Sequence, residues 1–134
     1  TRRSSDLAYR RKMKFVDGTY DPHRSETREA SQTGDDTIEL YDRFWSHPPQ
    51  AKDAMFAHEI GHLVLTRFGL SEFIGEARRV GVDVWDRDSL PFSAKNMDEA
   101  FADAYAEWLL APDELRRRHP AWFELAERLH LATR

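Results

Sequence analysis

The segment His58-Glu59-Ile60-Gly61-His62 constrains this chain more than any other feature. It follows the pattern His-Glu-x-x-His, inside a stretch whose apolar residues recur at helical spacing. Residues four positions apart on a helix share one face, so both imidazoles can bind one zinc ion. Glu59 stands beside them, where its carboxylate can take a proton from a zinc-bound water. The alternative is a surface helix with two solvated histidines, because so short a motif also arises by chance.

The composition of the 134-residue chain fits one folded domain that is large enough to hold such a site. Four Trp and eight Phe can fill much of a core. There is no Cys, which excludes disulfides, thiolate zinc ligands and cysteine nucleophiles together. Any bound metal must therefore be held by His and carboxylate side chains.

Positive charge gathers at the start of the chain, although the net charge is −4. We divide the chain into a basic N-terminal arm at residues 1–14 and one domain at residues 15–134. The arm could contact nucleic acid, a membrane or a partner, but we expect a solubilising terminus and no nucleic-acid contact. No stretch approaches the roughly 20 apolar residues of a transmembrane helix, so we expect no membrane span. The first residue is Thr, which suits a domain of a larger parent chain.

Alternating apolar residues predict a small twisted sheet and hence an α+β fold. We expect strands at residues 13–16 and 37–44, with a polar loop at residues 21–36. After a short helix at residues 72–79, alternating valines predict a further strand at residues 80–84.

Three long helices are expected to carry the rest of the domain. The first is capped by Ser46, continues through the His-Glu-x-x-His segment, and ends before Gly69. The second begins at Asn96, which can cap it, and is limited by Pro112. The last begins at Pro120, because Pro fits the first turn of a helix.

A catalytic zinc site needs three protein ligands and one open position, so a third ligand must come from another element. Glu99 is the best candidate, because it lies in the first turn of the second long helix. Asp103 falls one turn later on the same face, where it can accept a hydrogen bond from a zinc-bound His. Asp98 is a weaker candidate for this supporting role. Alternatively, Glu99 only caps the helix by turning back to Asn96, and Asp103 is a solvated helix residue.

The combination of His58-Glu59-x-x-His62 with Glu99-x-x-x-Asp103 resembles the pattern of gluzincin metallopeptidases. A closer resemblance, over residues 54–131, is to the catalytic domain of the anthrax lethal factor-like family, which includes the bacterial Pro-Pro endopeptidases. The segments most similar to the end of that domain are residues 98–106, 112–115 and 120–125. The ImmA/IrrE family, peptidases linked to phage-repressor cleavage, is a near rival, because residues 104–112 partly match its helix.

The resemblance implies a zincin-like single domain with an active-site helix, a third-ligand helix and a C-terminal helix. It implies a zinc-dependent endopeptidase that holds one Zn2+ per chain, uses Glu59 as general base, and cleaves a protein or peptide substrate. By analogy with zincins, a strand at the sheet edge would bind extended substrate, here through Ile38, Glu39, Leu40 and Tyr41. The family places a Tyr seven residues before the ligand Glu to support the oxyanion. This chain has Phe92 there, and Phe cannot donate a hydrogen bond.

The sequence therefore leaves two kinds of function open. The first is the endopeptidase, which the resemblance makes the catalytic domain of a toxin or effector, secreted or delivered into a target cell and paired with an immunity or regulatory partner. The second is a non-catalytic zinc-containing sensor or binding module of a repressor-regulating type, with a cytoplasmic location. The presence of Glu59 favours the enzyme, because a purely structural zinc site needs no general base. Surface or structural roles are expected for the remaining histidines, His23, His47, His119 and His130.

Overall fold

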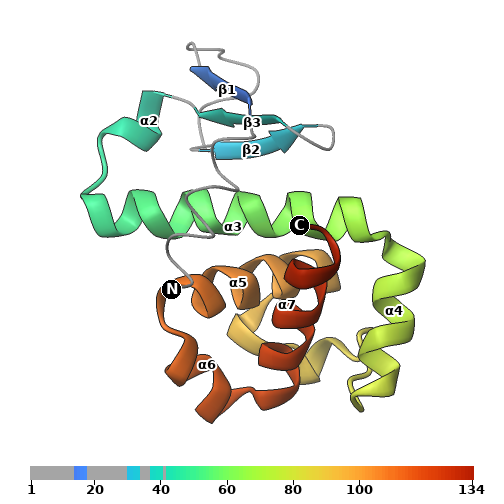
Figure 1. Ribbon diagram of the computed structural model, residues 1–134. Coiled ribbons are helices and arrows are strands. Elements are labelled where there is room, and N and C mark those ends of the chain that lie inside the picture. The colour runs from blue at the N-terminus through green and yellow to red at the C-terminus, as the bar shows by residue number, and fades with distance from the viewer. Residues whose placement is uncertain (1–13, 18–29, 34–36, 41) are drawn as a thin grey trace.

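A long central helix divides the domain into two layers. The computed structural model describes residues 14–17, 30–33, 37–40 and 42–134. Helix α3 (Pro49–Phe68) lies between a small sheet on one side and the remaining long helices on the other (Figure 1). Helix α4 continues from its C-terminal end. The helices after α3 are α4 (Leu70–Arg79), α5 (Met97–Leu110), α6 (Pro112–Arg118) and α7 (Pro120–Ala132).

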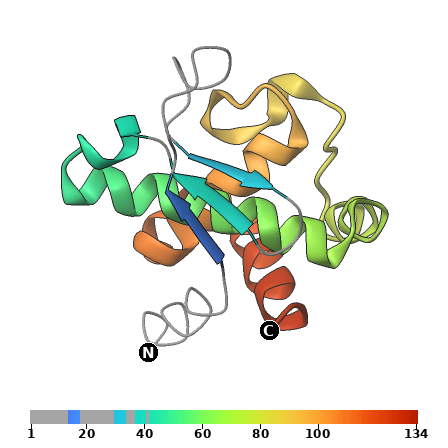
Figure 2. The same ribbon diagram turned by 90° about the horizontal axis from the view of Figure 1, so that it is seen from above.

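The sheet contains three four-residue strands, which cross above α3 (Figure 2). They are β1 (Lys14–Asp17), β2 (Ala30–Thr33) and β3 (Thr37–Leu40). The order is β1-β3-β2, with β1 parallel and β2 antiparallel to β3. Ile38 of β3 is fully buried and belongs to the core beneath the sheet.

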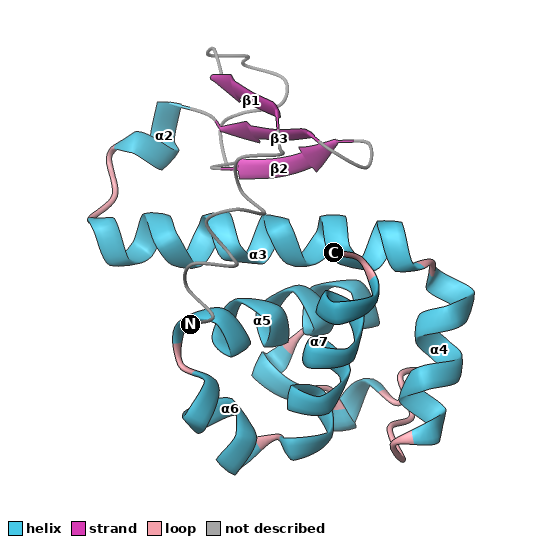
Figure 3. Cartoon of the chain, in the orientation of Figure 1, coloured by secondary structure: helices cyan, strands magenta, loops and turns pink. Residues whose placement is uncertain are grey.

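The predicted α+β class is wrong, because the structure is mostly helical (Figure 3). From residue 42 to residue 134 no residue lies in a strand. The strand predicted at residues 37–44 stops at Leu40, and α2 (Asp42–Trp45) follows it. This short helical turn buries Phe44, as a longer strand could also have done. The single apolar residue therefore did not show from sequence whether the chain turns or continues as a strand.

The strand predicted at residues 80–84 is also wrong, because this segment begins with the turn at the C-terminal end of α4. Gly81 adopts a left-handed φ of 85° directly after α4. Its N–H donates to the carbonyl of Arg78, and the N–H of Val82 donates to the carbonyl of Ala77. This pair of bonds is the Schellman arrangement, which reverses the chain and prevents an extended strand. Two short 3-10 turns, η1 (Arg87–Ser89) and η2 (Pro91–Ser93), lead on to α5.

The predicted ends of the two site-bearing helices agree with the structure except at the start of α3. Pro48, rather than Ser46, occupies the position before the first turn of α3, where a missing N–H costs little. Gly69 ends that helix with φ 100°, a conformation that favours glycine. Asn96 caps α5 by accepting a 2.9 Å hydrogen bond from the N–H of Glu99.

Helix α5 is the centre of the helical layer and is buried on two faces. One face meets α3, and the other packs through Phe101 against Phe73 of α4, with ring centroids 5.4 Å apart. Trp122 of α7 completes this cluster at 6.4 Å from Phe73. Alanines at positions 100, 102, 104 and 106 keep the helix slim between its neighbours.

Helices α3 and α5 approach each other closely at Gly61, inside the His-Glu-x-x-His segment. A methyl group there would lie 2.8 Å from the Cα of Ala102 and 3.0 Å from the Cβ of Tyr105. Both atoms belong to the α5 framework, so they cannot swing aside as the tip of a flexible side chain could. The absence of a side chain at Gly61 therefore sets the distance between the two helices.

The N-terminal arm predicted at residues 1–14 lies outside the described residues, except for Lys14 at the start of β1. Among the helices of the described chain, none combines the length and apolar character that a membrane span requires.

We predict that Gly61→Ala lowers the free energy of unfolding by about 1–3 kcal/mol, because the added methyl forces α3 and α5 apart. Chemical denaturation followed by circular dichroism measures this change. Gly75→Ala is the matched control, since Gly75 lies in α4 with open space around it. It should raise stability by about 0.5–1 kcal/mol through helix propensity alone. Equal effects of the two substitutions would contradict the close-packing explanation.

Candidate metal centre

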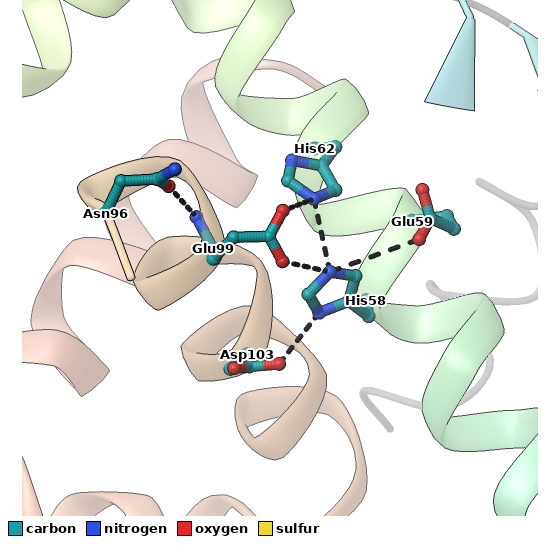
Figure 4. A network of polar contacts seen from close by, with 6 residues as sticks. All are labelled: His58, Glu59, His62, Asn96, Glu99 and Asp103. Atoms are coloured by element: carbon teal, nitrogen blue, oxygen red, sulfur yellow. Dashed lines mark hydrogen bonds and ion pairs between the residues drawn. The ribbon is translucent and has the colours of Figure 1, made fainter. Parts of the chain in front are cut away.

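Three side chains from two helices meet beside this close contact (Figure 4). Helix α3 supplies His58 and His62, whose Nε2 atoms lie 3.1 Å apart. Helix α5 supplies Glu99, with Oε2 3.1 Å from the Nε2 of His58 and Oε1 3.1 Å from the Nε2 of His62. These three residues form a group that could hold a metal ion. Sequence spacing predicted all three.

The hydrogen bond of His58 to Asp103 determines what this group can hold. Asp103 Oδ1 lies 2.7 Å from His58 Nδ1, and a carboxylate accepts, so Nδ1 carries the ring proton of neutral His58. The Nε2 atom then presents a lone pair toward the carboxylate of Glu99. Acceptor atoms that converge in this way repel one another unless a proton or a metal ion lies between them. The site is therefore chemically suited to a cation.

The spacing of the ligand atoms also fits a bound metal. Tetrahedral zinc ligands at about 2.0–2.1 Å from the ion lie roughly 3.3 Å from one another. The two Nε2 atoms lie 3.1 Å apart, and each lies 3.1 Å from a different oxygen of Glu99, so the nitrogen–nitrogen spacing is close to that of a zinc site. The two His side chains are about one-fifth exposed, whereas that of Glu99 is 45% exposed. Solvent thus reaches the group from the Glu99 side.

Competing effects act on the pKa of His58. Burial lowers it, but the hydrogen bond to Asp103 and the charges of Glu59, Asp103 and Glu99 outweigh burial. As a result, the pKa of His58 is raised above its usual 6.5. In the absence of metal, the same carboxylates that would orient a ligand histidine instead favour its protonated form.

Glu59, the residue after His58 on α3, lies beside the group. It is buried, with 9% of its surface exposed, and its Oε2 lies 4.0 Å from the Nε2 of His58. A buried carboxylate at this position can reach a water molecule held beside the three ligand atoms. Figure 4 shows Glu59 and Glu99 approaching His58 from different helices.

The helix cap and the ligand assignment of Glu99 turn out to be compatible. Its backbone N–H is bound by Asn96, while its side chain points to the two imidazoles (Figure 4). The predicted alternative, a side chain turned back to cap the helix, is not what the structure has. Asp98 is exposed on the first turn of α5, and no described hydrogen bond or ion pair joins it to either imidazole.

Phe92 packs against a histidine that is not part of the group His58, His62 and Glu99. The ring of Phe92 lies 5.3 Å from that of His119 and is partly buried. The hydroxyl of Tyr105 lies 2.7 Å from Nδ1 of the buried His130 on α7. His130 therefore has the structural role that was predicted for it.

The predicted substrate strand is corrected by the order of the sheet. Ile38, Glu39 and Leu40 belong to β3, which is the central strand and pairs with a neighbour on each side. Its backbone groups are already used in these ladders, so it is not an edge that could accept a peptide. Tyr41 lies outside the described residues.

One contributor to the site and one hydrogen bond in the core were missed from sequence. Gly61 was counted only as a variable position of the motif, although a glycine inside a helix signals close packing. The bond between Tyr105 and His130 joins residues far apart in the chain, and no local pattern could have revealed it.

Comparison with known proteins gives no match to a protein-family model, a curated protein or a solved structure. Any function assigned to this chain therefore rests on the chemistry of the site itself.

We predict that Asp103→Ala weakens zinc binding by about 10- to 100-fold, because His58 loses the partner that orients it. Glu99→Ala, which removes a ligand, should weaken it by more than about 100-fold. Competition with a chelating dye measures both affinities. Glu107→Ala is the control, since Glu107 lies on the same helix and pairs with Arg118 instead. A loss in the control as large as in Glu99→Ala would refute the ligand assignment.

We also predict a pH dependence from the raised pKa of His58. Protonated His58 stabilises the metal-free fold fully below pH 6.5, and this contribution is lost as the pH rises through the raised pKa. Zinc competes with that proton, so zinc affinity should fall on acidification from a pH above 6.5. An NMR titration of the imidazoles and dye competition at several pH values measure the two effects. In Asp103→Asn the midpoint of His58 should move down; an unchanged midpoint would contradict the assigned cause.

Proposed function

We propose that this chain is a zinc-dependent endopeptidase domain of the gluzincin type, related to the lethal factor-like enzymes. The buried carboxylate of Glu59, 4.0 Å from a ligand atom of the three-residue group, is the observation that carries the proposal. Burial of a charged residue is costly, and a purely structural zinc site needs no general base beside it. The same placement is what a general base for hydrolysis requires.

The roles of the residues follow from their positions. When bound, zinc would supply a Lewis acid that polarises the scissile carbonyl and lowers the pKa of its water to about 7. His58, His62 and Glu99 would hold it, and Asp103 would keep His58 in the tautomer whose Nε2 is free to bind. Glu59 would take the proton from the attacking water and then pass it to the leaving amine. No Ser or Cys nucleophile is needed.

We assign the binding of extended substrate to β2 instead of β3. Among the described strands β2 pairs only with β3, so its other side is the edge of the sheet. It also contacts α3, above which it lies in Figures 1 and 2. A peptide added to this edge would bond through its backbone and run beside the helix that carries Glu59.

Turnover is expected to be slow, because Phe92 offers no hydrogen bond to an oxyanion. Loss of one such donor typically lowers the rate about 100- to 1000-fold without abolishing the reaction. A weak but specific protease would suit a protein that acts on one or a few targets.

We predict that the wild-type chain binds about one zinc and cleaves members of a peptide library, whereas Glu59→Gln binds zinc but does not cleave. The substitution preserves shape and removes the base. Elemental analysis gives the zinc content, and mass spectrometry detects cleavage. Asp53→Asn is the matched control, because Asp53 is an exposed acid on the same helix, and it should retain full activity.

Zinc-bound wild type that cuts no peptide or candidate protein would favour the sensor function over the enzyme. Absence of zinc binding would reject both functions.

A further inference from the structure

Glu99 presents both of its carboxylate oxygens to the imidazole pair. Oε2 lies 3.1 Å from the Nε2 of His58, and Oε1 lies 3.1 Å from the Nε2 of His62. The two nitrogens are themselves 3.1 Å apart, so the four atoms surround one small space (Figure 4). Each oxygen of Glu99 thus faces one imidazole nitrogen, and both oxygens border the same space.

The second oxygen also lacks a competing partner. In the described part of the chain, the polar contacts of the Glu99 carboxylate are with His58 and His62 only. The backbone N–H of Glu99 is taken by Asn96, which fixes the first turn of α5 and thereby the origin of the side chain. Neither oxygen is turned toward a lysine, an arginine or a backbone N–H that would hold it away from the metal position.

We propose that Glu99 binds the metal through both oxygens, so that the chain provides four donor atoms from three residues. This inference depends on the proposed metal-binding role of the site. With one water added, the centre is five-coordinate, in contrast to the four-coordinate arrangement of three single-atom ligands and a water. Metals that accept five or six ligands, such as Co2+ and Mn2+, should therefore bind here more readily than in a strictly tetrahedral site.

X-ray absorption of the zinc-loaded protein and visible absorption of the cobalt-loaded protein test this assignment. In wild type we expect about five nitrogen and oxygen neighbours, a longer mean zinc–ligand distance, and the weak cobalt bands of a five-coordinate ion. Glu99→Gln offers only one carbonyl oxygen. It should give about four neighbours, a shorter mean distance and stronger cobalt bands.

Glu107→Gln is the matched control, because it makes the same chemical change on the same helix at a residue paired with Arg118. Its spectra should equal those of wild type. A four-coordinate wild type with the spectra of Glu99→Gln would overturn the two-oxygen assignment and leave the proposed protease intact. If Glu99→Gln binds no metal, the coordination number of zinc in the wild type is the test by itself. Five neighbours support the two-oxygen assignment, and four contradict it. A wild type that binds neither zinc nor cobalt would instead reject the proposed function.

Discussion

The contact between Gly61 and Ala102 is the constraint on which the site depends. His58 and His62 are fixed to one helix, and Glu99 and Asp103 to another, so the distance between the helices decides whether the four side chains meet. A methyl group at Gly61 would lie 2.8 Å from the backbone of α5. The glycine of the motif therefore has a chemical consequence, although it carries no functional group itself.

The site was more predictable from sequence than the fold, and the reason is the range of the interactions involved. The spacing of His58 and His62 is a local property of a helix, and the Asn96 cap fixed the phase of α5 for Glu99 and Asp103. The prediction of a strand at residues 80–84 was wrong because the turn at Gly81 outweighs the alternation of valines. The central position of β3 follows from pairing between distant segments, which no local pattern encodes.

The electrostatics of the site connect metal binding to protonation. Asp103 holds one nitrogen of His58, and the opposite nitrogen faces a second carboxylate from Glu99. A histidine between two acids gains from a positive charge whether that charge is a proton or a metal ion. The surrounding carboxylates therefore favour either a proton or a metal ion at His58. The pH of the solution decides which of the two is bound.

The partial exposure of Glu99 has a consequence for how an ion could reach the proposed centre. The histidines and Glu59 lie on a helix with a buried apolar face, while the side chain of Glu99 is 45% exposed. An ion can therefore enter and leave without opening the core. The occupancy of the proposed centre would then follow the free metal concentration around the folded molecule.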